Sequence, residues 1–257
     1  MIDFHSHIVY DVDDGSDTIE NSIKILKEAK KAGFNKILLT PHYMQDYYEF
    51  PANEIRERIE ILQEKCEEEN INIELYQANE IYINNNIVEL LDEQVASTMN
   101  NSRYVLIETP MSEEPPNLLE VIYQLLENGK IPVVAHPERY SYVQKNPNKL
   151  IELIDNGVLF QSNYGSILGQ YGKEVEKTVK LLLENNFIHF LGTDVHKQGN
   201  IYMRMDEVES KLRKIISEEK IEELTTINPQ KVIDDDDIYI NEPSEIKQGF
   251  FEKIFHK

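Results

Sequence analysis

Residues that can bind a metal ion stand at the ends of successive strand-like segments along this chain of 257 residues. Each segment is a short apolar run, and a histidine, an aspartate or a glutamate closes it or follows soon after. Because the carboxyl ends of parallel strands meet at one edge of a sheet or one mouth of a barrel, such side chains are expected to converge in space. The candidate ligands are His5, His7, Asp14, His42, Glu80, Glu108, His136, Asp194 and His196.

Apolar runs alternate with amphipathic helical patterns along most of the chain. Strands that alternate with helices pair in parallel, since each crossover helix returns the chain to the same edge. The expected strands are 2–7, 36–40, 73–80, 103–108, 131–136, 158–163 and 188–194. The expected helices are 18–32, 53–70, 118–128, 149–156, 174–186 and 203–217.

Seven such strands can form an open doubly wound sheet or a closed barrel. An open sheet gathers its binding site at one switch point in the strand order, whereas a barrel brings all strand ends to one mouth. Candidate ligands at nearly every strand end therefore favour the barrel. The fold class expected is α/β, a TIM-like (β/α)7 barrel with the metal site at the C-terminal ends of the strands.

The side chains at the strand ends indicate which metals they would bind. His5 and His7 are two residues apart on a strand and so share a face, and Asp194 and His196 repeat that spacing. Imidazoles and carboxylates without thiolates suit Mn, Fe or Zn. Nine candidate ligands exceed the needs of one ion, so two or three ions are expected. His189 lies inside an apolar run, where we expect a position in the core or on a face of the strand.

The charge of the chain is strongly acidic, with 47 acidic residues, 26 basic residues and a formal net charge of −21. General nucleic-acid binding depends on lysine and arginine to neutralise phosphates, so this balance argues against it. An anionic substrate is still compatible, because bound cations can reverse the local field.

The chain has one cysteine, Cys66, which cannot form an internal disulfide and suits a reducing compartment. The N-terminal residues show no secretory signal. No stretch has the ~18–20 apolar residues that span a bilayer, so no transmembrane segment is expected. These features predict a cytoplasmic protein.

Other residues near the candidate ligands have ordinary structural explanations. Asp11 and Asp13 lie beside Asp14 in the turn before the first helix and are alternatives to it as ligands, but turn formation and capping of that helix are favoured for both. Four tyrosines follow strand ends, and they are candidates either for stacking on an aromatic ring or for ordinary loop positions. They are Tyr10, Tyr43, Tyr47 and Tyr48.

The residues at the strand ends resemble a known family. The chain is similar to the PHP (polymerase and histidinol phosphatase) superfamily, and within it to the bacterial manganese-dependent protein-tyrosine phosphatases of capsule and exopolysaccharide operons. The resemblance runs from Met1 to about residue 230. Its motifs are 1–8 (MIDFHSHI), 13–16 (DDGS), 40–42 (TPH), Glu80, 107–108 (IE), 135–140 (AHPERY) and 192–196 (GTDVH).

The resemblance implies a distorted barrel of the PHP type over residues 1–230, with 231–257 as an acidic and then apolar tail. It implies a manganese site of three ions, held by His5, His7, Glu80 and Asp194, by Glu80, Glu108 and His136, and by Asp14, His42 and His196. The implied activity is hydrolysis of protein phosphotyrosine. The implied partner is the phosphorylated tail of a bacterial tyrosine kinase that controls capsular or exopolysaccharide synthesis.

Phosphate chemistry fits these residues. Clustered cations lower the pKa of bound water and neutralise phosphoryl oxygens. Arg139 follows the candidate ligand His136 by three residues, and its guanidinium fork suits a pair of phosphoryl oxygens. Arg204 is a second candidate for phosphate binding, and for both arginines a surface ion pair is the alternative. Cysteine-dependent phosphatase chemistry is excluded, since Asn72 and not an arginine stands six positions after Cys66.

Three alternative functions stay open. The same site could cleave histidinol phosphate, another small phosphomonoester or a phosphodiester, although the acidic charge counts against a nuclease. Amidohydrolase barrels also begin with two histidines in this spacing, but they usually have a bridging lysine where this chain has Glu80 and Glu108. A non-catalytic scaffold that regulates a kinase by binding it is the third alternative.

The chain changes character after about residue 230. Four aspartates at 234–237 precede an apolar segment that contains Phe250, Phe251, Ile254 and Phe255. One interpretation is a solvated acidic loop followed by a short helix packed on the barrel. The other is an interaction tail for a partner subunit or a membrane surface.

Overall fold

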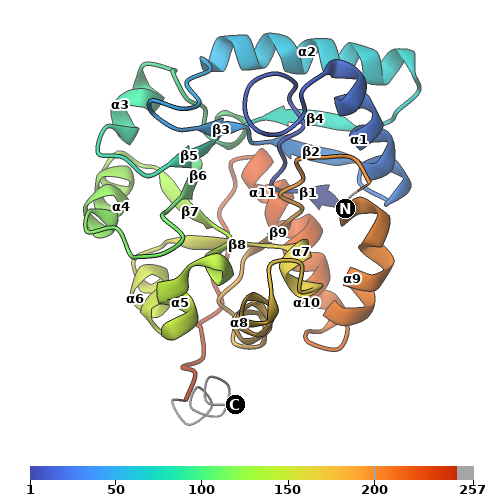
Figure 1. The fold of residues 1–257 in the computed structure, drawn as a ribbon. Helices are drawn as coiled ribbons and strands as arrows, with labels where there is room; N and C mark the ends of the chain where they lie inside the picture. The colour runs from blue at the N-terminus through green and yellow to red at the C-terminus, as the bar shows by residue number, and fades with distance from the viewer. Residues whose placement is uncertain (200, 248–257) are drawn as a thin grey trace.

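The computed structural model describes residues 1–199 and 201–247, which form a barrel of strands with helices around it (Figure 1). The strands pair in parallel in two sheets, of order β1-β2-β4 and β3-β5-β6-β7-β8-β9. Their bounds are β1 (Ile2–Asp3), β2 (Lys36–Leu39), β3 (His42–Tyr43), β4 (Glu74–Gln77), β5 (Glu80–Tyr82), β6 (Tyr104–Glu108), β7 (Ile131–Ala135), β8 (Leu159–Asn163) and β9 (Phe190–Gly192).

Two strands of the barrel are interrupted, and both continue past the ends predicted for them at residues 40 and 80. β2 and β3 are the two halves of one strand, and β4 and β5 are the two halves of its neighbour. The register is the same on both sides of the break, because Leu39 lies opposite Gln77 and His42 lies opposite Glu80. Because two pairs of the nine strands among the described residues are halves of a single strand, the nine strands occupy seven positions around the barrel.

Backbone contacts between the first and last strand positions close the barrel. Asp194 N donates to His5 O at 2.8 Å, and His7 N donates to Val195 O at 2.9 Å. Ser6 and Val195 form a parallel bridge between these two bonds. This closure confirms the predicted barrel, and the open doubly wound sheet is wrong. It also brings the two ends of the ligand series, at β1 and β9, side by side.

Side chains alternate between the inside and the outside of the barrel with the two-residue period of a strand. Phe4, Leu106 and Phe190 pack inside, where the rings of Phe4 and Phe190 stack with centres 4.0 Å apart. Ile107 faces the outer layer of helices. Glu108 is two residues after Leu106 at the end of β6 and faces inward as Leu106 does. Its carboxylate therefore lies at the mouth of the barrel.

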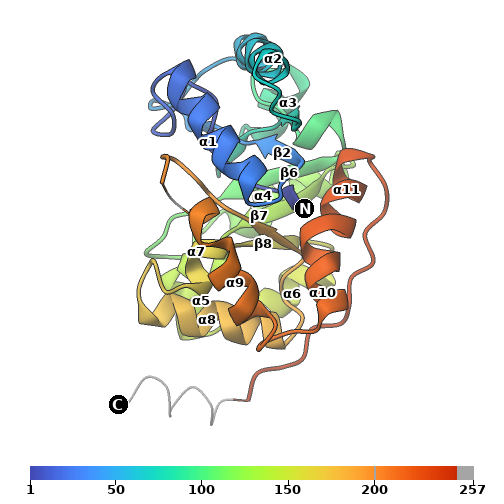
Figure 2. The ribbon, with the colours of Figure 1, turned by 90° about the vertical axis from the view of Figure 1, so that its right-hand side faces the viewer.

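Helices cover the outside of the barrel and one of its ends. Their bounds are α1 (Ile19–Lys31), α2 (Ala52–Glu68), α3 (Ile87–Asp92), α4 (Leu118–Glu127), α5 (Ser141–Lys145), α6 (Lys149–Asp155), α7 (Tyr164–Ile167), α8 (Lys173–Glu184), α9 (Met205–Leu212), α10 (Glu218–Glu222) and α11 (Asn228–Ile233), with short turns η1 (Met99–Asn101), η2 (Pro137–Arg139) and η3 (Ile201–Arg204) and the π-helix η4 (Glu223–Ile227). The Thr18 hydroxyl caps α1 by accepting from Asn21 N, so the prediction that Asp11 or Asp13 caps this helix is wrong. At the end away from the β1–α1 loop, α11 packs Val232 into the barrel interior (Figure 2).

The segment after α11 runs along the barrel. The acidic run 234–237 is exposed, as expected of a solvated loop, and Arg103 pairs with Asp235 and Asp237. Further on, Ile246 is buried and its N–H donates to the side chain of Asn148 at 2.9 Å. The apolar segment 249–255 and its expected helix lie outside the described residues. Within the described ranges, no helix has the length and apolar character needed to cross a membrane.

Candidate metal centre

Four of the candidate ligands converge at the mouth of the barrel, where β1, β5 and β9 come together. His5 Nε2 lies 3.1 Å from His7 Nε2 and 3.2 Å from Glu80 Oε2. Asp194 Oδ1 lies 3.8 Å from His5 Nε2 and 3.5 Å from His7 Nε2. All four side chains are buried. They are the residues that the resemblance groups around one ion.

Hydrogen bonds turn the lone pairs of the two imidazoles toward one another. His5 Nδ1 lies 2.8 Å from Gln161 Oε1, and His7 Nδ1 lies 2.7 Å from Asp13 Oδ2. We therefore assign the proton of each neutral ring to Nδ1, which leaves both Nε2 atoms as acceptors facing Glu80. Buried acceptors that face each other are unfavourable without a cation or a proton between them. Ligands at about 2.1 Å from one ion stand about 3 Å apart, so these residues fit a bound cation.

A second group of donors lies beside the first and shares Glu80 with it. Glu80 Oε1 lies 3.0 Å from His136 Nε2, and Glu80 Oε2 lies 3.1 Å from His42 Nδ1. The Glu108 carboxylate lies 3.6 Å from His136 Nε2 and 3.9 Å from His42 Nδ1. In the part of the chain that the structure describes, no hydrogen bond reaches the buried Glu80 Oε2 or His136 Nδ1. Glu80 thus stands between two donor groups, as a bridging carboxylate would.

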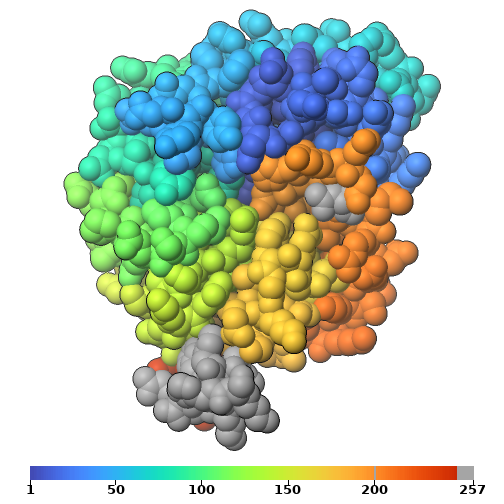
Figure 3. All heavy atoms as spheres, in the orientation of Figure 1, coloured from blue at the N-terminus to red at the C-terminus, as the bar shows by residue number. Residues whose placement is uncertain are grey.

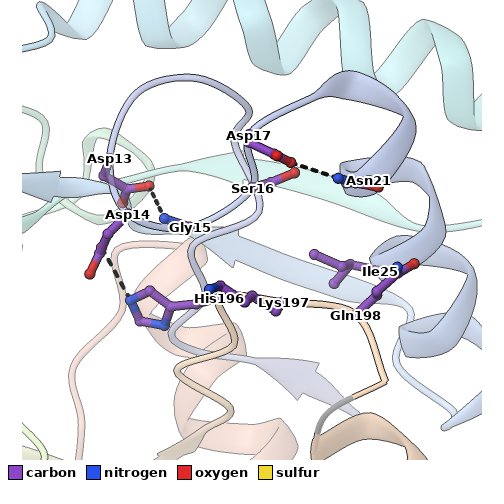
Figure 4. Close-up of a pocket in the computed structure, with 10 residues that line it drawn as sticks. All are labelled: Asp13, Asp14, Gly15, Ser16, Asp17, Asn21, Ile25, His196, Lys197 and Gln198. Carbon is purple, nitrogen blue, oxygen red and sulfur yellow. Dashed lines mark hydrogen bonds and ion pairs between the residues drawn. The ribbon is translucent and has the colours of Figure 1, made fainter.

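A third group lies at the outer edge of the mouth, beside a cavity of ≈ 600 Å³ between the β1–α1 loop and residues 196–198 (Figure 4). Asp14 Oδ1 lies 3.4 Å from His196 Nε2 and 3.6 Å from His42 Nε2. His196 Nδ1 lies 3.6 Å from Asp194 Oδ1. Figure 3 shows residues of the β1–α1 loop (dark blue) beside residues that follow β9 (orange) on this face. His42 therefore faces both the second and the third group, whereas the resemblance places it in the third alone.

The charges of the site shift the pKa values of its ligands. Burial raises the pKa of Glu80, but the imidazoles of His5 and His42 outweigh this effect and hold the pKa well below its usual value. Burial and the carboxylates of Glu80 and Asp194 raise the pKa of Glu108 to about 8. In the metal-free protein Glu108 therefore keeps its proton at neutral pH, and a cation that binds there must displace it.

Known proteins are similar to this chain over nearly its whole length. A family model described as capsular polysaccharide synthesis, CpsB/CapC, matches residues 1–234. The chain belongs to the CpsB/CapC family. Tyrosine-protein phosphatase YwqE of Bacillus subtilis is 30% identical over 255 residues, which cover 98% of this chain and 100% of that protein. Tyrosine-protein phosphatase CpsB of Streptococcus pneumoniae is 32% identical over 240 residues, which cover 91% of this chain and 99% of that protein.

Solved structures of CpsB/CapC proteins have the same fold. One solved chain, described under crystal structures of YwqE from Bacillus subtilis and CpsB from Streptococcus pneumoniae as metal-dependent tyrosine phosphatases, matches with a TM-score of 0.90 at 30% identity, covering 96% of this chain and 100% of that chain. A histidinol phosphate phosphatase from Lactococcus lactis matches with a TM-score of 0.55 at 16% identity, covering 83% of this chain and 93% of that one. The second likeness shows the fold alone. Together they confirm the predicted PHP-type barrel.

Asp13 has a role in this CpsB/CapC barrel that the sequence did not reveal. Its Oδ2 accepts from His7 Nδ1 and, at 2.9 Å, from the backbone N–H of His42. Its Oδ1 accepts from Gly15 N at 3.0 Å, which confirms the predicted turn. A carboxylate behind a metal-binding histidine fixes the ring and raises its basicity. Because the bond to His42 spans 29 residues, no local pattern indicates it.

The backbone also shapes the mouth of the barrel. A Cβ added to Gly192 would stand 2.7 Å from His5 Cβ, so only glycine lets the last strand approach this histidine. Gln161 orients the His5 ring from the other side. His136 and Asp194 have positive φ angles of 34° and 52°, which are uncommon for side chains larger than glycine and occur at functional sites. These turns end the strands and aim both side chains at the donor groups.

The two arginines predicted to bind phosphate lie in different surroundings. Arg139 Nη1 donates to Asp194 Oδ2 at 2.9 Å, and its guanidinium lies 4.5 Å from the centre of the Tyr171 ring. Arg204 is exposed and donates to Glu207 at 2.8 Å. Among the described residues, it has no hydrogen bond or ion pair with a candidate ligand. A phosphate-binding role of Arg204 stays a prediction.

Cys66 and His189 are buried elsewhere in the fold. Cys66 lies in α2, where burial raises the pKa of its thiol to about 11 and disfavours the reactive thiolate. His189 Nδ1 accepts from Phe160 N at 3.1 Å inside the protein. The predicted core position of His189 is therefore confirmed.

Proposed function

We propose that this chain is a metal-dependent protein-tyrosine phosphatase that acts on the phosphotyrosine tail of a bacterial tyrosine kinase in capsular or exopolysaccharide synthesis. The observation that carries the proposal is the three adjoining donor groups at the barrel mouth with Arg139 at their edge. Membership of the CpsB/CapC family supports it. So does the nearly full-length similarity to YwqE and CpsB, which are named tyrosine-protein phosphatases.

The proposed cofactor is a cluster of two or three Mn ions, with Fe or Zn as alternatives. The proposed ligand sets are His5, His7, Glu80 and Asp194, then Glu80, Glu108 and His136, and finally Asp14, His42 and His196. Donor atoms 3.0 to 3.8 Å apart within these sets support the assignment. Bound cations of this kind supply Lewis acidity and an activated water near neutral pH.

The chain's own residues bind and orient the phosphate ester. Asp194 and the ring of Tyr171 hold the guanidinium of Arg139, and we propose that its other N–H groups donate to two phosphoryl oxygens. Arg204 would make a second phosphate contact after leaving Glu207. Both arginines would offset part of the repulsion between the carboxylates of the site and a dianionic substrate.

We also propose a division of the chain and a location for it. Residues 1–230 would form the catalytic barrel, and 231–257 would form an accessory tail whose first residues complete α11 and pack Val232 into the barrel interior. The single buried cysteine fits a reducing compartment, and we propose a cytoplasmic location.

A substrate panel with added Mn tests the proposed function. It compares kcat/KM for a phosphotyrosyl peptide, p-nitrophenyl phosphate, histidinol phosphate, a phosphodiester and a cyclic amide. We expect the phosphotyrosyl peptide to be preferred. Preference for histidinol phosphate would favour a small-molecule phosphatase, and turnover of the amide alone would favour an amidohydrolase. Binding of a kinase tail without turnover of any compound would favour the scaffold.

A further inference from the structure

The four tyrosines that follow strand ends lie in different surroundings. Tyr43 is buried in the core, and the ring of Tyr10 lies 5.6 Å from the guanidinium of Arg58. Tyr47 is 74% exposed at the tip of the loop between β3 and α2. Tyr48 is half-buried, and its ring contacts a candidate metal ligand.

A short hairpin holds Tyr48 in position. Met44 N donates to Tyr48 O at 2.9 Å, and Tyr48 N donates to Met44 O at 2.8 Å. Asp46 turns the chain at the tip with a left-handed φ of 69°. Beyond the hairpin, Phe50 packs on the core with its ring 4.6 Å from the guanidinium of Arg58. The loop is therefore tied to the barrel at its base and presents Tyr48 in a defined position.

The ring of Tyr48 lies nearly parallel to the imidazole of His42, with centres 5.8 Å apart and planes 15° apart. His42 faces Asp14 through Nε2 and faces Glu80 and Glu108 through Nδ1. Tyr48 thus forms an aromatic wall directly beside the second and third donor groups.

We propose that Tyr48 lines the subsite for the phenyl ring of the phosphotyrosine substrate, with Tyr47 at the outer rim of the same loop. The inference rests on the proposed function, because a phosphoryl group held among the donor groups directs its ester oxygen outward. An aromatic ring on that oxygen meets Tyr48, whereas an alkyl phosphate offers no ring to contact. Tyr48 is then a specificity residue that favours aryl phosphates.

The contact is expected to have a moderate effect. Loss of one contact between aromatic rings weakens binding of a phenyl-bearing ligand roughly 2- to 10-fold. Binding of the phosphoryl group itself depends on the donor groups and Arg139, which Tyr48 does not supply. A ligand without a ring is therefore expected to bind equally well to the wild type and to Tyr48→Ala.

Two phosphonate inhibitors separate these contributions in the Mn-loaded full chain. Their Ki values are measured against p-nitrophenyl phosphate turnover. Tyr48→Ala should raise the Ki of phenylphosphonate roughly 2- to 10-fold and leave the Ki of methylphosphonate unchanged. Tyr48→Phe should keep both wild-type values. Tyr123→Ala, at an exposed tyrosine on α4, is the matched control and should also keep both.

The same measurements show how the inference would fail. Equal changes in both Ki values, with bound Mn unchanged, would mean that Tyr48 supports His42 and does not contact the substrate ring. If Tyr48→Ala does not fold, Tyr48→Leu, which keeps side-chain volume, provides the Ki ratio instead. A wild-type chain that does not hydrolyse a phosphotyrosyl peptide contradicts the proposed function. Wild-type turnover with an unchanged Ki ratio in the variant contradicts this inference alone.

Discussion

Replacement of Asp13 by asparagine tests whether one carboxylate holds two proposed metal ligands, His7 and His42, in place. Its Oδ2 accepts from His7 Nδ1 at 2.7 Å and from His42 N at 2.9 Å, while its Oδ1 accepts from Gly15 N at 3.0 Å. Asparagine has the same shape but only one acceptor oxygen, because its other terminal group is an NH2 donor. In either orientation of the asparagine amide, its NH2 group faces at least one N–H group that donates to the Asp13 carboxylate in the wild type.

The expected effect on metal binding is large enough to measure. Removal of a carboxylate behind a metal-binding histidine costs roughly 10- to 100-fold in metal affinity or activity, or about 1.4–2.7 kcal/mol. We expect Asp13→Asn to weaken Mn binding by this factor and to lower p-nitrophenyl phosphate turnover at limiting Mn to a similar degree. Competition with a fluorescent chelator measures the Mn affinity.

Asp17→Asn is a matched control in the same loop. Asp17 accepts from the Asn21 side chain at 2.6 Å, and within the described ranges it has no hydrogen bond or ion pair with a candidate ligand (Figure 4). This variant should bind Mn like the wild type. Mn affinities of both variants within about twofold of the wild type would refute the role assigned to Asp13, since that role requires at least tenfold.

Three further predictions concern the backbone, the site charges and the core. Gly192→Ala places a Cβ 2.7 Å from His5 Cβ, so chelator competition should show at least a tenfold loss of Mn affinity, and wild-type affinity would contradict the close approach. Because the pKa of Glu108 is raised to about 8 without metal, Mn binding at pH 7 should release at least about one proton, and fewer as the pH rises above 8. Calorimetry in buffers of different ionisation enthalpy measures this release, and none at pH 7 would contradict it. Burial lowers the pKa of His189 to about 3, so the unfolded chain binds a proton below pH 6.5 that the folded chain does not. The free energy of unfolding, measured with urea on chelated protein, should therefore fall by about 1.5 kcal/mol more between pH 6.5 and pH 5 in the wild type than in His189→Asn, and equal falls would contradict the burial of a neutral ring.

The fold and the set of converging side chains could be predicted because both follow from short patterns. Strands that alternate with helices imply parallel pairing, and the period of two carries Leu106 to Glu108 at the mouth. The barrel was favoured over the open sheet because ligands ended nearly every strand. The bonds of His5 and His7 to the last strand position confirm that choice.

The missed features depend on contacts between distant segments. The sequence around Asp13 is typical of a turn, and only the folded barrel brings its carboxylate to His42. The left-handed conformation of His136 could not be predicted, because the residue before a proline, here Pro137, usually has an extended backbone. The phosphate-binding role of Arg204 stays a prediction, because its exposed side chain pairs with Glu207 in the structure and order along the chain does not indicate which group it binds.

The most direct measurement is the rate of phosphotyrosyl peptide hydrolysis by the full chain before chelation, after chelation and after Mn is returned. If cations at the barrel mouth are required, EDTA abolishes hydrolysis and Mn restores it. Iodoacetamide should leave the rate unchanged, because Cys66 is buried and the pKa of its thiol is raised to about 11. Hydrolysis that survives EDTA, or that iodoacetamide abolishes, would contradict a metal-dependent reaction without a cysteine nucleophile.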